Sequence, residues 1–185
     1  LHLEELASHK GSVLGALPDL AQPSQKMFET RLYQRLSTFD PARPVFTEAE
    51  SRLIGRLRLP DSIIDAIRVA RGINITSPLE SRVDFLLGDY AYLCDAAKLN
   101  PYLDRLKELQ GRERVARWQH LAVAGDFRTL VTELLAQHYD PHYTRSQQKN
   151  FSPCGQMRTY TTVDLTPAAL ESLADRVLAD FPHSA

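Results

Sequence analysis

Three stretches of this sequence predict an α/β fold with a mostly parallel sheet. Ile73–Thr76 alternates apolar and polar residues as a strand does, and Ser77–Glu80 directly after it has the pattern of a capping box. Thr159–Val163 is β-branched and aromatic and also precedes a helix start. Val45–Phe46 is a short apolar run before an acidic turn. A strand followed at once by a helix is the unit from which parallel sheets are built.

The composition is that of an ordinary globular domain. The 185 residues are 43% hydrophobic and 24% charged with a net charge of −1, so a nucleic acid could bind only at a local cluster of cations. Cys94 and Cys154 are too few for a disulfide framework. No apolar run approaches the roughly 20 residues of a membrane helix, and we expect no signal peptide, because no basic stretch followed by an apolar one opens the sequence. We therefore expect one cytoplasmic domain without a membrane partner. Because the chain opens on Leu1 rather than methionine, we also expect a fragment of a longer protein.

The other elements follow in order. Leu1–Leu3 has the pattern of a strand end. Ser24 is placed to cap a helix whose apolar residues recur at helical spacing, and Pro60 opens a further helix. Residues 95 to 137 have helical patterns throughout, which suggests a helical insertion or lid over about 95–145, with Asn100-Pro101 starting its first helix. The last helix follows Thr166-Pro167.

The region from Pro44 to Pro60 carries the densest group of chemically useful side chains. Glu48 and Glu50 follow the apolar run, and Arg52 and Arg56 come soon after. In open α/β sheets, ligands bind outside the carboxyl ends of the strands, where such acids would lie. The alternative is a solvated acidic loop after a strand.

Two weaker signals point to an anion. His9, Lys10 and Ser12 could offer an imidazole, an ammonium and a hydroxyl near backbone amides, although a plain loop explains them as well. Arg82 lies in the first turn of the helix that Ser77–Glu80 begins, where a cation opposes the helix dipole. An unfavourable residue such as this cation, placed near the end of a strand, indicates a functional role.

The stretch His138–Arg145 suggests a metal site, because the potential ligands His138, Asp140 and His142 lie at every second position. We expect Pro141 to interrupt the helix, so that the two histidines do not share a face. Tyrosines interleaved with histidines and an arginine are better suited to base stacking and phosphate contact. The alternative is a capped helix end packed by tyrosine.

Five motifs recur in a known order. Leu3–Ser12 is similar to L-E-G-L-A-x-H-R/K-G-S, Gln22–Glu29 to Q-P-S-Q-K-x-F-E, and Glu48–Gly55 to E-x-E-S-R-x-I-G. Pro78–Val83 and His138–Tyr143 match two later motifs. With these motifs the chain resembles the bacterial tRNA 2-selenouridine synthases over nearly its whole length.

The resemblance implies an enzyme with an N-terminal rhodanese-like domain and a P-loop-containing domain. It would convert wobble 2-thiouridine in tRNA to 2-selenouridine through an S-geranyl intermediate. Its substrates would be geranyl diphosphate and selenophosphate, with Mg²⁺ as a candidate cofactor. Residues 1–185 would be the C-terminal domain, with a P-loop NTPase type of sheet whose central strand precedes Leu1. As an isolated chain it is expected to be inactive.

The sequence departs from the family pattern at several points. It contains no G-x-x-x-x-G-K-S/T motif and no rhodanese-like loop around either cysteine. His2 stands where the family usually has aspartate, and Glu5 where it has glycine. These departures leave two function classes open: an enzyme domain that handles a diphosphate and RNA, or a non-catalytic RNA-binding or interaction module.

Taken together, the residues and the resemblance predict three groups of site residues and two partners. The predicted catalytic acids are Glu48 and Glu50, with no resident metal ligands. The predicted substrate- and phosphate-binding residues are His9, Lys10, Ser12, Gln25, Lys26, Arg52, Arg56 and Arg82. The predicted tRNA-binding residues are His138, Tyr139, Tyr143 and Arg145. The expected partners are tRNA and the enzyme's own rhodanese-like domain.

Overall fold

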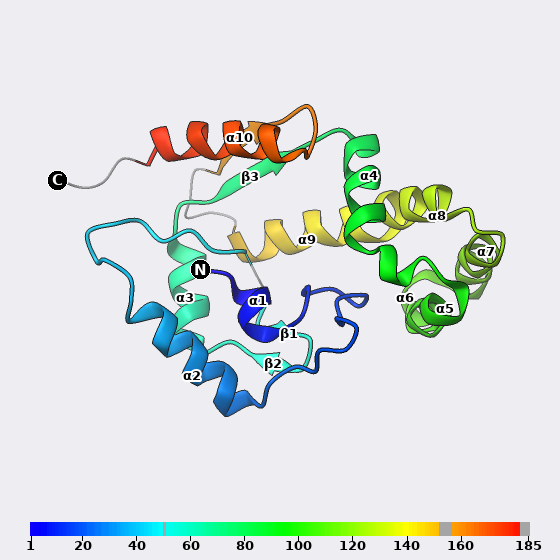
Figure 1. The fold of residues 1–185 in the computed structure, drawn as a ribbon, viewed down its shortest axis with the longest axis horizontal. Helices are drawn as coiled ribbons and strands as arrows, with labels where there is room; N and C mark the ends of the chain where they lie inside the picture. Colours follow the sequence, from blue (N-terminus) through cyan, green and yellow to red (C-terminus); the bar gives the residue numbers. More distant parts are fainter. Residues whose placement is uncertain (50, 152–156, 182–185) are drawn as a thin grey trace. The chain divides into compact units, whose positions relative to one another are not determined.

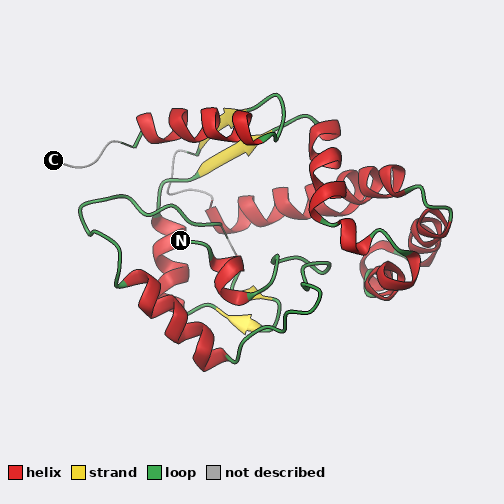
Figure 2. Ribbon diagram, in the orientation of Figure 1, coloured by secondary structure: helices red, strands yellow, loops and turns green. Residues whose placement is uncertain are grey.

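The structure, a computed structural model, describes residues 1–49, 51–151 and 157–181. Helices make up most of these residues, and the strands are few and short (Figure 2). The chain divides into two compact units, Leu1–Ala70 with the segment from Leu178, and Arg71–Val177.

The first unit contains three helices and a short hairpin (Figure 1). Its elements are α1 (Leu3–Ala7), α2 (Gln25–Leu36), β1 (Leu53–Ile54), β2 (Leu57–Arg58) and α3 (Asp61–Val69). The predicted cap of α2 is confirmed, because the Ser24 hydroxyl accepts a hydrogen bond from the backbone N–H of Met27 at 3.2 Å. Asp61 in the first turn of α3 suits the positive end of the helix dipole.

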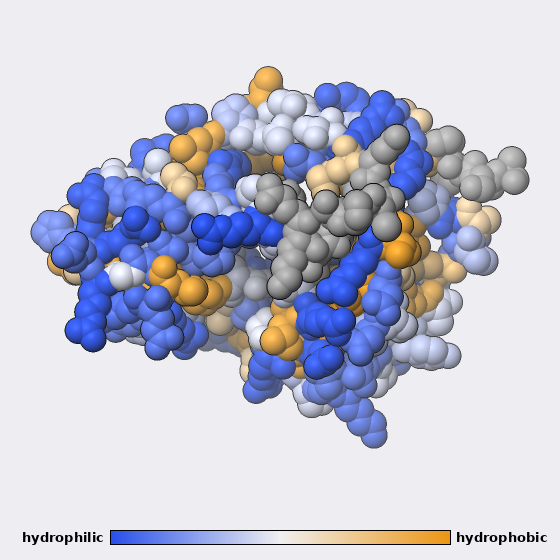
Figure 3. Space-filling model, turned by 180° about the vertical axis from the view of Figure 1, so that it is seen from behind, coloured by the Kyte–Doolittle hydropathy of each residue, from blue (hydrophilic) through white to orange (hydrophobic). Residues whose placement is uncertain are grey.

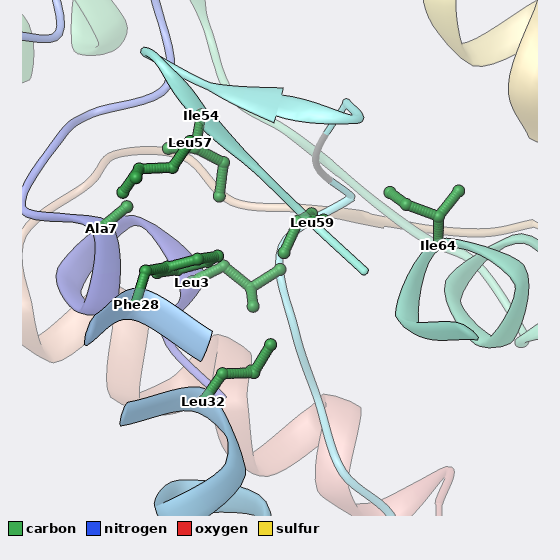
Figure 4. Close-up of a cluster of buried hydrophobic side chains, with 8 residues drawn as sticks. All are labelled: Leu3, Ala7, Phe28, Leu32, Ile54, Leu57, Leu59 and Ile64. Carbon is green, nitrogen blue, oxygen red and sulfur yellow. The ribbon is translucent and has the colours of Figure 1, made fainter. Parts of the chain in front are cut away.

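One apolar cluster holds the first unit together (Figure 4). Side chains from α1, α2, the hairpin and α3 converge in it, and Phe28 of α2 is fully buried at its centre. Each large apolar side chain that is fully buried contributes roughly 1.5–3 kcal/mol. The cluster consists of Leu3, Ala7, Phe28, Leu32, Ile54, Leu57, Leu59 and Ile64.

Two strands predicted in the first unit are wrong. Leu3 begins helix α1 instead of ending a strand, because Glu4 and Glu5 favour the first turn of a helix and the Glu48 carboxylate accepts from the Leu3 N–H at 3.0 Å. Val45–Phe46 is not in a strand. The Phe46 carbonyl instead accepts from the N-terminal ammonium of Leu1 at 2.6 Å. A strand requires hydrogen-bond partners along its length, and a run of two apolar residues does not specify a pairing strand.

The second unit combines a small parallel sheet with a series of helices. In order along the chain these are β3 (Ile73–Thr76), α4 (Leu79–Asp89), the 3₁₀ turn η1 (Ala91–Leu93), α5 (Ala96–Asp104), α6 (Lys107–Gln110), α7 (Arg112–Val123), α8 (Phe127–Leu134), the π-helical turn η2 (Leu135–Tyr139), α9 (Asp140–Phe151), β4 (Arg158–Thr161) and most of α10 (Pro167–Ala179). Gly125-Asp126 separates α7 from α8, and the Asp126 carboxylate caps α8.

The predicted strand–helix unit at Ile73 is confirmed. β3 pairs with β4 in parallel, with Ile75 opposite Tyr160 and Thr76 opposite Thr161. Helix α10 runs alongside this sheet (Figure 1), and Arg176 on it donates to the Thr161 carbonyl at 2.9 Å. The sheet is smaller than predicted, since among the described residues the only other strand pair is the antiparallel hairpin β1–β2.

The predicted capping box of α4 does not form. Pro78 is the N-cap of α4, and the Ser77 hydroxyl makes no hydrogen bond within the described part of the chain. The reason lies in the register of the helix: it begins at Leu79, so Glu80 is its second residue and not its third. The Asn100-Pro101 prediction is also wrong, because α5 already begins at Ala96, capped by the Asp95 carboxylate.

A second apolar core fills the space between α5, α6, α7 and α8. Trp118 and Val115 of α7 are fully buried, and Leu103, Leu106 and Leu130 join them. The helical prediction for residues 95 to 137 is confirmed at the level of secondary structure, and its status as an insertion stays a prediction.

Hydrophilic residues cover most of the face seen in Figure 3, with apolar residues in separate small patches. None of the described helices is long and apolar enough to cross a membrane.

Candidate functional site

Arg82 and Asp140 join two motifs that lie far apart in the sequence. The guanidinium of Arg82 in α4 donates to both carboxylate oxygens of Asp140 at the start of α9, at 2.7 and 2.9 Å. Such two-pronged pairs are stronger and more specific than single contacts. The hydrogen bond to Asp140 raises the pKa of Arg82. The carboxylate also explains why a cation is tolerated near the start of α4.

His138, two residues before Asp140, lies at one end of a series of hydrogen bonds that runs through Gln110 to Arg114. Its side chain is only 4% exposed. The Nδ1 atom of His138 is 3.0 Å from the Nε2 atom of Gln110 at the end of α6. The Oε1 atom of Gln110 in turn accepts from the Arg114 guanidinium of α7 at 2.7 Å. Burial lowers the pKa of His138, and the nearby charge of His142 lowers it further.

The prediction that Pro141 breaks the helix is wrong. The π-helical turn η2 passes directly into α9, and Pro141 is the second residue of α9. The wider π turn leaves room for the proline ring, which has no N–H that needs a partner. The rings of His138 and His142 consequently lie on one face, with centroids 4.8 Å apart.

This shared face does not make a metal site. Among residues 1–49, 51–151 and 157–181, no group of three or more His, Cys, Asp or Glu could hold a metal ion. Asp140 is already bound by Arg82. A role for Mg²⁺ stays a prediction.

The outer part of α9 presents the remaining residues of the motif to solvent. His142 and Arg145 are exposed, and the Tyr143 side chain is 62% exposed. Tyr139 packs edge-on against His138, with ring centroids 4.7 Å apart. The predicted tRNA-binding residues therefore fall into the buried His138, the half-buried Tyr139 and an outer group.

Of the two predicted catalytic acids in the first unit, the structure describes Glu48 alone. Glu48 accepts from the Leu3 N–H at 3.0 Å and from the Thr47 hydroxyl at 3.3 Å, so its carboxylate caps helix α1. Glu50 lies outside the described residues. The catalytic role of either acid stays a prediction.

The three arginines around the hairpin all have partners within the first unit. Arg52 and Arg58 both pair with Asp61 of α3, Arg58 at 3.6 Å. The guanidinium of Arg56 donates to the Gln22 backbone carbonyl at 2.7 Å.

Two glutamines tie the motif segments of this unit together. Gln22 donates from its side chain to the carbonyls of Ile54 and Ala7, at 2.9 and 3.3 Å, and accepts from the Arg56 N–H at 3.0 Å. Gln25 exchanges two hydrogen bonds with the backbone of Arg58, at 2.7 and 2.9 Å. Sequence reasoning missed Gln22, although its place in a motif was a signal that could have identified it.

The predicted anion loop is a compact turn. The Lys10 N–H donates to the Gly15 carbonyl at 2.8 Å, and the Ser12 hydroxyl accepts from the Leu14 N–H at 3.2 Å. His9 packs against Gly15, and burial lowers the pKa of its imidazole. Lys26 is exposed on α2. The binding roles of these residues stay predictions.

These features define the class of the protein as an α/β domain in which separate sequence motifs meet in space. A family model described as the tRNA 2-selenouridine synthase AAA domain matches residues 1–120. The chain belongs to the tRNA 2-selenouridine synthase family.

Curated relatives agree with this assignment. A protein named tRNA 2-selenouridine synthase from Alcanivorax borkumensis is 36% identical over 172 residues, which cover 77% of this chain and 47% of that protein. One of the same name from Nitrosomonas eutropha is 28% identical over 213 residues, covering 89% of this chain and 54% of that protein. The chain thus spans about half the length of these relatives. No solved structure matches it.

Proposed function

We propose that this chain is the part of a tRNA 2-selenouridine synthase that binds tRNA, geranyl diphosphate or both. Membership of the family supports this proposal. The complete enzyme would convert wobble 2-thiouridine to 2-selenouridine through an S-geranyl intermediate, with selenophosphate as the second substrate. The chemistry would be shared with a rhodanese-like domain, and the α/β core would be of the P-loop NTPase type, completed by a central strand.

The outer part of α9 is the observation that carries the RNA part of the proposal. His142, Tyr143 and Arg145 lie close together along one helix and are exposed. An arginine fork matches phosphate oxygens, and an exposed aromatic ring can stack on a base. Within the described part of the chain Arg145 makes no ion pair, whereas Arg52 and Arg82 are each bound to an aspartate. Of the four arginines predicted to bind, Arg145 is therefore the one best placed to meet an RNA phosphate, since Arg56 donates to the Gln22 carbonyl.

The diphosphate part of the proposal rests on the end of the parallel sheet. Thr76 and Thr161 end β3 and β4 side by side, with their hydroxyls 3.0 Å apart. Ser81 in the first turn of α4 donates to the Val163 carbonyl beyond β4. Ligands of open α/β sheets bind at this end of the strands, and Arg82 lies in the same helix.

A non-catalytic RNA-binding module is the second candidate function. It is favoured by the internal bonds of Glu48, Arg52 and Arg82, which already satisfy these charged groups. The two candidates differ in whether this chain binds geranyl diphosphate. Binding of geranyl diphosphate to the chain would favour the enzyme domain, and binding of tRNA alone would favour the RNA-binding module.

Binding of tRNA can be tested with one pair of arginine variants. We expect Arg145→Ala to weaken binding of a tRNA transcript and to lower the slope of log K against log salt by roughly 0.7–0.9, the value for one lost phosphate contact. Arg43→Ala is the matched control, because Arg43 is an exposed arginine of the first unit outside all five motifs. Its slope should be unchanged. Equal slopes for the wild type and both variants would rule out α9 as the RNA contact.

A further inference from the structure

The hydrogen bonds around Gln110 determine which nitrogen of His138 carries a proton. Arginine has only donors, so the Gln110 atom that meets Arg114 at 2.7 Å must be its carbonyl oxygen. The amide nitrogen of Gln110 then faces His138 and donates to Nδ1 at 3.0 Å. A nitrogen that accepts a hydrogen bond carries no proton, so the proton of His138 lies on Nε2 and the ring is neutral.

This arrangement resists change because its two bonds depend on each other. If His138 were protonated, its Nδ1–H would point at the NH₂ group of Gln110. Turning the amide over would relieve that conflict and place the NH₂ group against the Arg114 guanidinium instead. Burial of the ring, at 4% exposure, further disfavours the charged form.

The neutral state of His138 matters for its neighbour. The ring of His142 lies 4.8 Å away, and two positive rings at that separation repel each other. His142 is exposed, whereas His138 is not. The charged groups that flank the pair have partners of their own: Asp140 is bound by Arg82 and Arg114 by Gln110. With His138 held neutral, no positive ring lies beside the exposed ring of His142.

We propose that Gln110 and Arg114 are positioning residues, which hold His138 as the neutral Nε2–H tautomer so that no second positive ring opposes contact between His142 and an RNA phosphate. Neither residue belongs to the five motifs. The RNA half of this inference rests on the proposed function, whereas the tautomer does not.

Nitrogen-15 NMR of the imidazoles in the whole chain tests the tautomer. In the wild type we expect the Nδ1 resonance of His138 at the position of an unprotonated nitrogen. Gln110→Glu replaces the donor by a carboxylate that accepts from Nδ1–H, so His138 should become protonated and titrate at a higher pH. Gln110→Met removes both bonds and should leave a mixture of tautomers. A wild-type ring protonated on Nδ1 would overturn the inference.

Binding of a tRNA transcript tests the RNA half. We expect Gln110→Glu to lower the salt slope by roughly 0.7–0.9, as His142→Ala should, and the double variant to lose no more than either. Gln137→Glu is the control, because it adds the same charge at an exposed position one residue from His138. It should leave both the tautomer and the slope unchanged.

The outcomes separate cleanly. Equal loss of slope in Gln110→Glu and Gln137→Glu would reduce the effect to added charge and overturn the coupling to His142. If the wild type binds no tRNA, the proposed function fails and the RNA half fails with it. The NMR result would still decide whether Gln110 and Arg114 fix the tautomer.

Discussion

At the scale of single residues, Glu133 of α8 is a carboxylate with two partners on α7, Arg117 and Trp118. It accepts from the Arg117 Nε atom at 2.9 Å and from the indole N–H of Trp118 at 3.2 Å. Its side chain is 15% exposed. The hydrogen bonds from Arg117, more than those from Trp118, hold the pKa of Glu133 below its ordinary value. The buried indole has this carboxylate as its acceptor in the core.

Substitutions of Glu133 should separate these two contacts. We expect Glu133→Ala to lower the free energy of unfolding by about 2 kcal/mol, because the buried Trp118 N–H is left without an acceptor. Glu133→Gln keeps an acceptor oxygen and should cost about 1 kcal/mol or less, since Arg117 is largely exposed and its charge is screened. Urea denaturation measures both. Glu113→Ala, at an exposed glutamate of the same helix pair, should change stability by less than about 0.5 kcal/mol.

The same glutamate gives a pH dependence whose sign is fixed. A carboxylate with a lowered pKa in the folded state stabilises the protein above its unfolded pKa, and this contribution is lost as the pH falls through the folded pKa. The stability difference between the wild type and Glu133→Gln should therefore be full near neutral pH and shrink below about pH 4.5. A difference that stays constant down to pH 3 would contradict this account.

At the scale of elements, the hairpin β1–β2 depends on Gly55. Gly55 has a φ of +59°, which residues with a side chain rarely adopt. A Cβ atom there would lie 2.3 Å from the Oε1 atom of Gln22. That oxygen accepts from the Arg56 N–H, so it cannot move without breaking the link between the hairpin and the Gln22 motif.

Two glycine substitutions should therefore have opposite signs. We expect Gly55→Ala to destabilise the first unit by about 2–3 kcal/mol, from the unfavourable φ and the displaced Gln22. Gly88→Ala is the matched control, because Gly88 lies within α4 with no atom near the added methyl group, and it should stabilise by about 0.5–1 kcal/mol. Urea denaturation followed by circular dichroism distinguishes the two. Equal effects would mean that Gln22 does not constrain the hairpin.

Elements with a complete local signal were predictable from the sequence. The alternation at Ile73–Thr76 and the apolar spacing behind Ser24 each contain the pattern of a whole element, and both elements are found. The strand predicted at Val45–Phe46 was wrong because two apolar residues do not specify a strand partner. The prediction of a helix break at Pro141 was wrong because proline usually ends a helix. The wider π turn that accommodates this proline has no recognisable sequence pattern.

The candidate site was predictable in its residue types and not in its pairings. Arg82 and Asp140 were each selected, one as phosphate-binding and one as part of a doubtful metal site, but 57 residues separate them and only the fold brings them together. Gln110 and Arg114 carry no motif at all. Gln110 is bonded to His138, 28 positions further along the chain, and Arg114 acts on His138 only through its bond to Gln110.

At the scale of the whole molecule, the chain has two compact units, each with a buried core of its own. The first core centres on Phe28, and the second contains Trp118. Proteins with separate cores often unfold in more than one step. Trp118 is the sole tryptophan of the chain, so its fluorescence reports on the second unit only.

We therefore expect a core substitution to act on its own unit. Phe28→Ala should cost about 3–5 kcal/mol and produce an early transition in far-ultraviolet circular dichroism, while the transition seen by Trp118 fluorescence stays in place. Leu103→Ala, which opens the second core, should cost about 2–5 kcal/mol and move the fluorescence transition to lower urea. Each variant serves as the control for the other. If both variants shift both signals together, the two cores form one cooperative structure, and the free energies measured for Glu133 and Gly55 must then be assigned to the whole chain.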